Sequence, residues 1–151
     1  MHELAIDYQA TWDPTFEPTR LRIAATPNKS RVLVADDDID MRRLLGMTLR
    51  RAGYDVVEAH DGVDLLDQIE STIERRDFFS VIVADINMPG LTGLDVLAAL
   101  RCTTWATPVI LITAYGDPAT RAEAKDLGAV LLEKPLDLDA LRVAVKRVVA
   151  L

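Results

Sequence analysis

Val81-Ile82-Val83-Ala84-Asp85 closes a short apolar run, Phe79–Ala84, and places an aspartate directly after it. The run Val32–Ala35 is of the same kind and is followed by Asp36. An apolar run without alternating polar side chains is typical of a strand that is buried on both faces of a parallel sheet. The strands that we expect are Val32–Ala35, Tyr54–Ala59, Phe79–Ala84, Val109–Thr113 and Val130–Leu132.

Segments with a helical period lie between these runs. In the first of them Leu45 and Leu49 share one face, whereas Arg42 lies on another face. We expect Asp38 or Asp40 to cap this helix rather than to bind a metal. The expected helices are Met41–Ala52, Val63–Arg75, Leu94–Arg101, Pro118–Leu127 and Leu138–Ala150. Strands that alternate with helices in this way predict an α/β domain with a parallel sheet and right-handed crossovers.

Composition excludes several classes of protein. The chain has 151 residues, half of them apolar, which is enough for one domain with a core. Its 17 basic and 24 acidic side chains give a net charge of −7, which disfavours direct binding to nucleic acid or to a membrane surface. The single cysteine, Cys102, is expected to pack as a small hydrophobe and fits a reducing compartment. With no recognisable secretory signal, we expect a cytoplasmic protein.

The chain changes character near residue 30. Residues 1–30 show no sustained period, and Pro14, Pro18 and Pro27 interrupt them. We therefore expect a loosely ordered leader over residues 1–30, followed by one folded domain over residues 31–151.

Polar side chains follow four of the five expected strands. Asp36-Asp37-Asp38 comes after the first strand, Asp85 after the third, Thr113 at the end of the fourth, and Lys134 shortly after the fifth. The carboxyl ends of parallel strands share one edge of the sheet, where ligands bind, so these groups are expected to converge. Clustered carboxylates without a nearby histidine or thiolate favour Mg²⁺ as the ion that compensates their charge.

Taken together, these motifs resemble the receiver domain of two-component response regulators. The residues that carry the resemblance are Val32–Asp38, Asp85 with Pro89 and Gly93, Thr113-Ala114, and Lys134-Pro135, each placed at the end of its own strand. The resemblance covers residues 31–151. It implies a flavodoxin-like, doubly wound (βα)5 domain whose five-stranded parallel sheet has the order 2-1-3-4-5.

The resemblance also implies roles for the acidic residues. Asp85 corresponds to the aspartate that accepts a phosphoryl group from a sensor histidine kinase or a histidine phosphotransfer protein. Asp37 is expected to bind Mg²⁺ directly, Asp36 to hold a metal-bound water, and the backbone carbonyl of Asn87 to join Asp85 in completing the protein ligands.

Further roles follow from the same resemblance. Thr113 and Lys134 are expected to bind the oxygens of the transferred phosphoryl group. A cis peptide between Lys134 and Pro135 is expected to direct the lysine into the pocket. The loop that begins at Ala114 is expected to move on phosphorylation, and Tyr115 to flank the phosphoryl site.

The sequence departs from the family pattern at the fifth strand. Many family members carry tyrosine or phenylalanine three residues before the lysine, whereas Leu131 stands there in this chain. Leu136 replaces the phenylalanine that often follows the Lys-Pro pair. We therefore expect the face used for signalling to differ from that of the family, with Leu131 repacking when the domain switches.

The function implied is that of a phosphorylation-dependent switch. It would control a protein partner or an effector domain outside this chain, and it would catalyse only its own phosphorylation and dephosphorylation. A phosphorelay intermediate and a pseudo-receiver that never takes phosphate remain alternatives, and a phosphorylation-linked homodimer remains open. A remote alternative is a phosphatase with its nucleophile within Asp36–Asp40, a stretch that resembles the motif of haloacid-dehalogenase-type enzymes.

Overall fold

The structure, a computed structural model, describes residues 29–150. The predicted leader lies outside the described residues except for its last two positions, so the division at residue 31 remains a prediction. No helix within residues 29–150 is long and apolar enough to cross a membrane.

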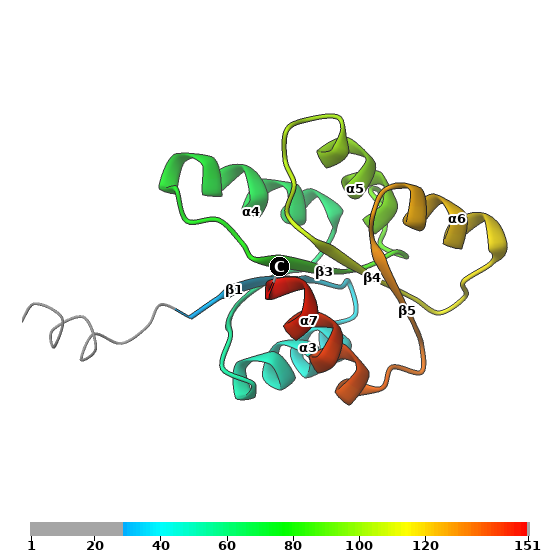
Figure 1. Cartoon of the computed structure of the whole chain (residues 1–151), viewed down its shortest axis with the longest axis horizontal. Helices are drawn as coiled ribbons and strands as arrows, with labels where there is room; N and C mark the ends of the chain where they lie inside the picture. The colour runs from blue at the N-terminus through cyan, green and yellow to red at the C-terminus, as the bar shows by residue number, and fades with distance from the viewer. Residues whose placement is uncertain (1–28, 151) are drawn as a thin grey trace, which may run out of the picture.

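Five parallel strands form one sheet in the order β2-β1-β3-β4-β5, as predicted (Figure 1). β3 and β4 lie in the interior of the sheet and are buried at every residue, whereas the edge strand β5 is only partly covered. The strands are β1 (Arg31–Ala35), β2 (Asp55–Ala59), β3 (Val81–Asp85), β4 (Val109–Thr113) and β5 (Val130–Glu133).

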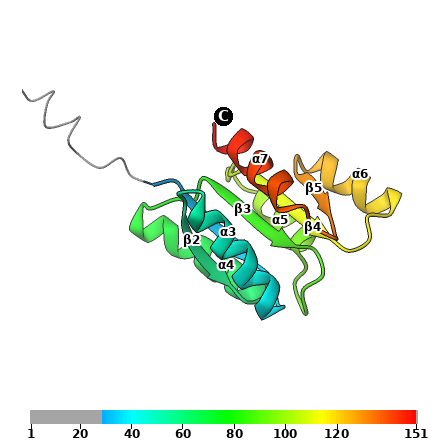
Figure 2. The same cartoon turned by 90° about the horizontal axis from the view of Figure 1, so that it is seen from below.

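Helices cover both faces of the sheet. Helices α3 and α7 pack on one face and α4, α5 and α6 on the other, and Figure 2 shows α3 and α7 from below. The helices are α3 (Ile39–Arg51), α4 (Gly62–Arg75), α5 (Gly93–Arg101), α6 (Pro118–Asp126) and α7 (Leu138–Val149). This is the flavodoxin-like, doubly wound arrangement that the sequence predicts.

The core is divided by the sheet into two clusters. Because successive strand residues point to opposite faces, Val32 and Val34 join the cluster under α3 and α7, while Leu33 and Ala35 join the cluster under α4, α5 and α6. All four are fully buried. Each valine or leucine buried in this way contributes about 1.5–3 kcal/mol, so this burial holds the sheet and the ends of its strands in place.

Two local predictions have clear outcomes. Asp38 rather than Asp40 caps α3, because its carboxylate accepts hydrogen bonds from the amides of Asp40 at 2.9 Å and Met41 at 3.4 Å. The prediction for Cys102 is wrong. This residue is the C-cap of α5 and is exposed, because it lies on the side of the helix opposite the buried Val96, Leu97 and Leu100.

Candidate functional site

The carboxyl edge of the sheet gathers the predicted polar residues. Asp36 follows β1, Asp85 ends β3, Thr113 ends β4 and Lys134 follows β5. The backbone joins these positions, since the amide of Lys134 donates a 2.8 Å hydrogen bond to the carbonyl of Thr113. Asp36, Asp85 and Thr113 are all buried.

Asp85 lies at the centre of the site, and its side chain is 5% exposed. One carboxylate oxygen accepts a 2.9 Å hydrogen bond from the amide of Asn87, and the other accepts a 2.9 Å hydrogen bond from the Lys134 ammonium. Gly93, at the start of α5, lies so close to the backbone of Asp85 that a Cβ added to the glycine would be 2.7 Å from the Asp85 carbonyl oxygen. The helix therefore requires glycine here, and it packs directly against the end of β3.

Asp36 is fully buried and only half satisfied. Its Oδ1 accepts a 2.9 Å hydrogen bond from the amide of Asp38, while its Oδ2 is buried without a partner among the described residues. Burial raises the pKa of Asp36 to about 6, and the negative charge of Asp85 adds to this effect. The unpaired oxygen makes the site one in which a cation would be stabilised.

Three carboxylates come together here. Each of Asp36, Asp37 and Asp85 offers an oxygen, and these oxygens lie within 4.8 Å of one another. Like charges about 4 Å apart repel by roughly 4 kcal/mol at an effective dielectric constant near 20. Asp37 is exposed, so the cluster opens to solvent on its side. An all-oxygen donor set of this kind suits a hard divalent cation.

Lys134 supplies the positive charge of the site. Burial opposes the charged form of its ammonium, but the hydrogen bond that the ammonium donates to Asp85 and the negative charges of Asp85, Asp36 and Asp38 outweigh burial and raise the pKa of Lys134. The lysine is therefore charged near neutral pH. The peptide between Lys134 and Pro135 is cis, as predicted.

Thr113 lies beside this cluster without joining it. Its hydroxyl donates a 3.0 Å hydrogen bond to the carbonyl of Tyr115 and accepts a 3.1 Å bond from the amide of the same residue. The side chain is thus hydrogen-bonded to its own loop. Ala114 is exposed and the side chain of Tyr115 stands largely in solvent. The roles predicted for these three residues remain predictions.

Leu131 belongs to the packing of the core and not to the carboxylate cluster. It is half-buried and packs against the core cluster under α4, α5 and α6. Leu136 packs against the opposite cluster, under α3 and α7.

Arg42 contacts the site although its sequence position suggested a helix surface. Its guanidinium donates a 2.9 Å hydrogen bond to the backbone carbonyl of Asp36 and lies 3.4 Å from the carboxylate of Glu58. Arg50 pairs with the same carboxylate at 2.9 Å. The signal that could have found this contact is Glu58, an acid within the otherwise apolar run Val56–Ala59.

Comparison with known proteins agrees with this geometry. The family model for the response regulator receiver domain matches residues 32–146. Sporulation initiation phosphotransferase F of Bacillus subtilis (strain 168) is 34% identical over 118 residues, which cover 78% of this chain and 91% of that protein. The C4-dicarboxylate transport transcriptional regulatory protein DctD of Pseudomonas aeruginosa is 38% identical over 120 residues, which cover 79% of this chain but only 25% of that protein.

Solved structures show the same likeness. The receiver domain of the Francisella response regulator 1452 superposes with a TM-score of 0.74 at 31% sequence identity, covering 81% of this chain and 98% of that one. A chemotaxis protein of Vibrio cholerae, CheY4, superposes with a TM-score of 0.70 at 33% identity.

The fold and the site define a class: doubly wound α/β domains that hold a carboxylate cluster and a lysine at the carboxyl edge of the sheet. Within this class, the chain belongs to the response regulator receiver domain family. Phosphorylation-dependent switching in two-component signalling, with Mg²⁺, is general to this family.

Proposed function

We propose that Asp85 is the phosphoryl acceptor of this receiver. The observation that carries the proposal is that Asp85, nearly buried, has one oxygen 2.9 Å from the Lys134 ammonium and lies in a cluster with two other carboxylates. In the reaction an oxygen of Asp85 attacks phosphorus, and the bond from phosphorus to the donor breaks. When the donor is a phosphohistidine of a sensor kinase or a histidine phosphotransfer protein, the leaving group is its imidazole.

We further propose that Asp36, Asp37, Asp85 and the backbone carbonyl of Asn87 hold Mg²⁺. The unpaired, buried Oδ2 of Asp36 and the all-oxygen donor set fit this ion. When bound, Mg²⁺ supplies positive charge that offsets both the three carboxylates and the incoming phosphoryl oxygens. Arg42 keeps the backbone of Asp36 in place from the other side.

Lys134 and Thr113 complete the site in this proposal. The lysine leaves its hydrogen bond with Asp85 and binds a phosphoryl oxygen, which keeps its charge close to where negative charge accumulates. The Thr113 hydroxyl, now held by the backbone of Tyr115, exchanges that bond for one to the phosphoryl group and draws the loop that begins at Ala114 inward.

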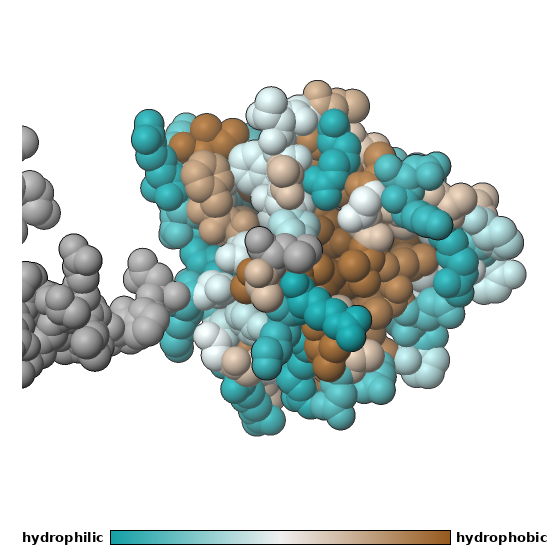
Figure 3. All heavy atoms as spheres, in the orientation of Figure 1, coloured by the Kyte–Doolittle hydropathy of each residue, from teal (hydrophilic) through white to brown (hydrophobic). Residues whose placement is uncertain are grey.

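We propose that the face formed by β5 and α7 passes the signal on. It carries a groove of about 300 Å³ that includes Val130, Val143 and Arg147. Val130 and Val143 are exposed although they are apolar, and Figure 3 shows an apolar patch on this side of the molecule. A downstream effector protein or domain, or a second phosphorylated copy of the chain, would bind there.

A relay role is the second candidate. The name of the Bacillus subtilis relative describes a phosphotransferase, and this chain covers 91% of that protein. In that case the group on Asp85 passes on to a histidine phosphotransfer protein. In either role we propose a cytoplasmic signalling domain whose only chemistry is its own phosphorylation and dephosphorylation.

Intact-mass spectrometry after incubation with acetyl phosphate tests the proposal. We expect one phosphoryl adduct that requires Mg²⁺ and disappears in Asp85→Asn. The matched control is Asp95→Asn, which changes an exposed aspartate in the first turn of α5 and should keep the adduct. The absence of any adduct in the wild type would favour a pseudo-receiver, and an adduct that survives Asp85→Asn would contradict the assignment of the acceptor.

A further inference from the structure

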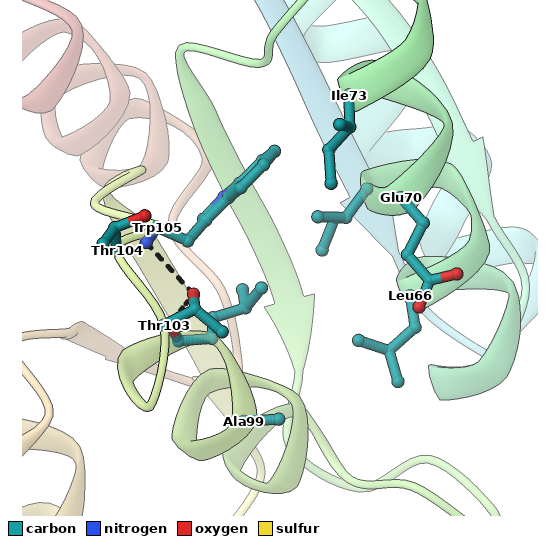
Figure 4. A pocket seen from close by; sticks show the side chains of 9 residues that line it. Leu66, Glu70, Ile73, Ala99, Thr103, Thr104 and Trp105 are labelled. Atoms are coloured by element: carbon teal, nitrogen blue, oxygen red, sulfur yellow. Dashed lines mark hydrogen bonds between the residues drawn. The ribbon is translucent and has the colours of Figure 1, made fainter.

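A second groove lies far from the acidic site, between the C-terminal halves of α4 and α5. It has a volume of about 450 Å³ and is lined mainly by apolar side chains (Figure 4). Ile73 of α4 and Trp105, just after α5, face each other across it, with Leu66 and Ala99 further along. An apolar groove of this size on a small domain is typical of a binding surface.

The apolar surface continues past the groove toward the start of β1. The rings of Phe78 and Trp105 are 5.6 Å apart and meet edge to face. Ile73 is 59% exposed and Phe78 is 54% exposed, so both large side chains face solvent at this end. The Trp105 indole N–H is buried and has no acceptor among the described residues. A segment that bound over Ile73, Phe78 and Trp105 would remove a sizeable apolar area from water.

The chain enters the domain next to this surface. Arg31, the first residue of β1, pairs with the carboxylate of Asp77 at 3.1 Å, and Asp77 directly precedes Phe78. Figure 1 shows that β1 begins on the side of the molecule where α4 ends. Residues 1–28 therefore connect to the domain within a few residues of the groove's aromatic wall.

The part of the chain just before β1 has the composition to fill the groove. Residues 19–30 read Thr-Arg-Leu-Arg-Ile-Ala-Ala-Thr-Pro-Asn-Lys-Ser, with three basic side chains and no acidic one in a protein of net charge −7. In an extended backbone Leu21 and Ile23 point to one side and Arg20 and Arg22 to the other. Ile23 lies seven positions before Ser30, and the stretch between them spans up to about 25 Å when extended.

The rim of the groove is acidic. Glu70 lines it, and Glu74 lies one helical turn further along α4, where both side chains are exposed. Neither carboxylate forms an ion pair with another residue in the described part of the chain. The basic pair of the preceding segment and the acidic pair of the rim thus have opposite charge.

We propose that residues 20–25 of this chain dock into the groove between α4 and α5. Leu21 and Ile23 fill the apolar floor beside Ile73 and Trp105, while Arg20 and Arg22 lie at the rim near Glu70 and Glu74. The proposal rests on the groove, the entry point of the chain and the charge pattern, and it is independent of the phosphoryl site.

Fluorescence of Trp105 in the chain of 151 residues tests the docking. The chain has two tryptophans, so Trp12→Phe leaves Trp105 as the reporter. In this background Leu21→Ser/Ile23→Ser should shift the emission to the red and raise quenching by acrylamide, because the indole loses its cover. The control, Leu4→Ser/Ile6→Ser, removes a similar apolar pair from the same terminus and should change neither. Unchanged emission and quenching in Leu21→Ser/Ile23→Ser, or the same change in both variants, would overturn the proposal.

Charge reversal tests the rim separately. Arg20→Glu/Arg22→Glu and Glu70→Arg/Glu74→Arg should each raise quenching of Trp105, and combining the two pairs should restore the original value. Effects that simply add in the combined variant would contradict an ion pairing between the segment and α4.

Disulfide trapping identifies which molecule supplies the segment. Cys102 is exposed beside the groove residue Thr103, and it is the only cysteine. In Ala24→Cys, with oxidised glutathione as the oxidant, we expect an intramolecular bond to Cys102 that forms roughly ten-fold faster or more than in the same variant carrying Leu21→Ser/Ile23→Ser. Equal rates would overturn the docking, and covalent dimers that depend on the two apolar residues would assign the groove to a second copy instead.

Discussion

The two ends of the parallel sheet differ in how far their charged side chains are buried. At the carboxyl end, Asp36 and Asp85 are buried among few partners, and one oxygen of Asp36 has none among the described residues. At the amino end, Arg31 pairs with the carboxylates of Asp55 at 3.5 Å and Asp77 at 3.1 Å, both of which are more than half exposed. The buried side chains at the amino end are aromatic and aliphatic, such as Phe79 and Val81.

The difference separates the part of the sheet that stabilises the fold from the part that performs the chemistry. Buried apolar groups at the amino end lower the free energy of the folded state, whereas buried carboxylates at the carboxyl end raise it. Buried carboxylates that destabilise the folded state are retained where a ligand or a reaction requires them. The comparison therefore predicts that substitutions at the two ends change stability with opposite sign.

The largest effect is expected at the amino end. Phe79 is 5% exposed and belongs to the core under α4, α5 and α6, and the centroid of its ring lies 4.6 Å from the guanidinium carbon of Arg31. Phe79→Ala should lower the free energy of unfolding by about 3–5 kcal/mol because it leaves a cavity. Urea unfolding measures this, and a loss below about 1 kcal/mol would show that this end does not anchor the sheet.

A substitution at the carboxyl end should act in the other direction. Asp36→Asn keeps the hydrogen bond from Asp38 and removes a buried charge from beside Asp85 and Asp37. We expect it to raise the free energy of unfolding by about 2 kcal/mol at pH 7 without Mg²⁺. Urea unfolding with a chelator present measures the gain, and a loss of stability would contradict the comparison.

The gain should depend on pH with a definite sign. The folded state raises the pKa of Asp36 from 3.8 to about 6, so between these values the folded protein binds more protons than the unfolded chain. The wild type therefore loses stability relative to Asp36→Asn as pH rises from about 4 to about 6. Unfolding curves of both proteins at several pH values should converge near pH 4. A difference that is the same at pH 4 and pH 7 would assign the effect to packing instead of charge.

Adding Mg²⁺ should sharpen the contrast. A cation bound among the carboxylates stabilises the folded state by about 1.4 kcal/mol when its concentration is ten times its Kd. Thermal unfolding with increasing Mg²⁺ should show a rising Tm for the wild type. Asp37→Asn should reduce the rise, and Asp55→Asn, a change of the same kind at the opposite end, should leave it intact. Equal responses of the two variants would indicate nonspecific binding.

The smallest effect is expected where the amino end is exposed. Phe78 is adjacent to Phe79 in sequence but only half-buried, and it contacts Trp105 edge to face. Phe78→Ala should lower the free energy of unfolding by about 1 kcal/mol, the range of one aromatic pair with its partial burial. A loss as large as that of Phe79→Ala would mean that residue 78 is covered in solution.

The sequence predicted the sheet because burial on both faces leaves an unmistakable pattern in the central strands. The stretches Val32–Ala35, Val81–Ala84 and Val109–Ile112 are apolar throughout, and because the strands are parallel their carboxyl ends meet at one edge. The approach of Asp36, Asp85 and Lys134 follows from that geometry. Strand order came from the family resemblance, and the sheet confirms it.

The hydrophobic pattern of the sequence could not predict contacts that depend on side-chain rotamers and loop conformation. Arg42 lies on the polar side of an amphipathic helix, and only the position of Glu58 on the adjacent strand turns it toward Asp36. The Thr113 hydroxyl is directed by the backbone of the loop that follows it. Cys102 was misjudged although α5 ends at Arg101 as predicted, because its position lies opposite the face formed by Val96, Leu97 and Leu100.

The measurement that tests the central claim most directly is the location of the phosphoryl group. After reaction with acetyl phosphate and Mg²⁺, treatment with borohydride reduces an acyl phosphate to an alcohol, and tandem mass spectrometry of the peptides then identifies the modified aspartate. We predict reduction at Asp85 alone. Reduction within Asp36–Asp38 would contradict the account, because the nucleophile would then lie among the residues that we assign to the metal.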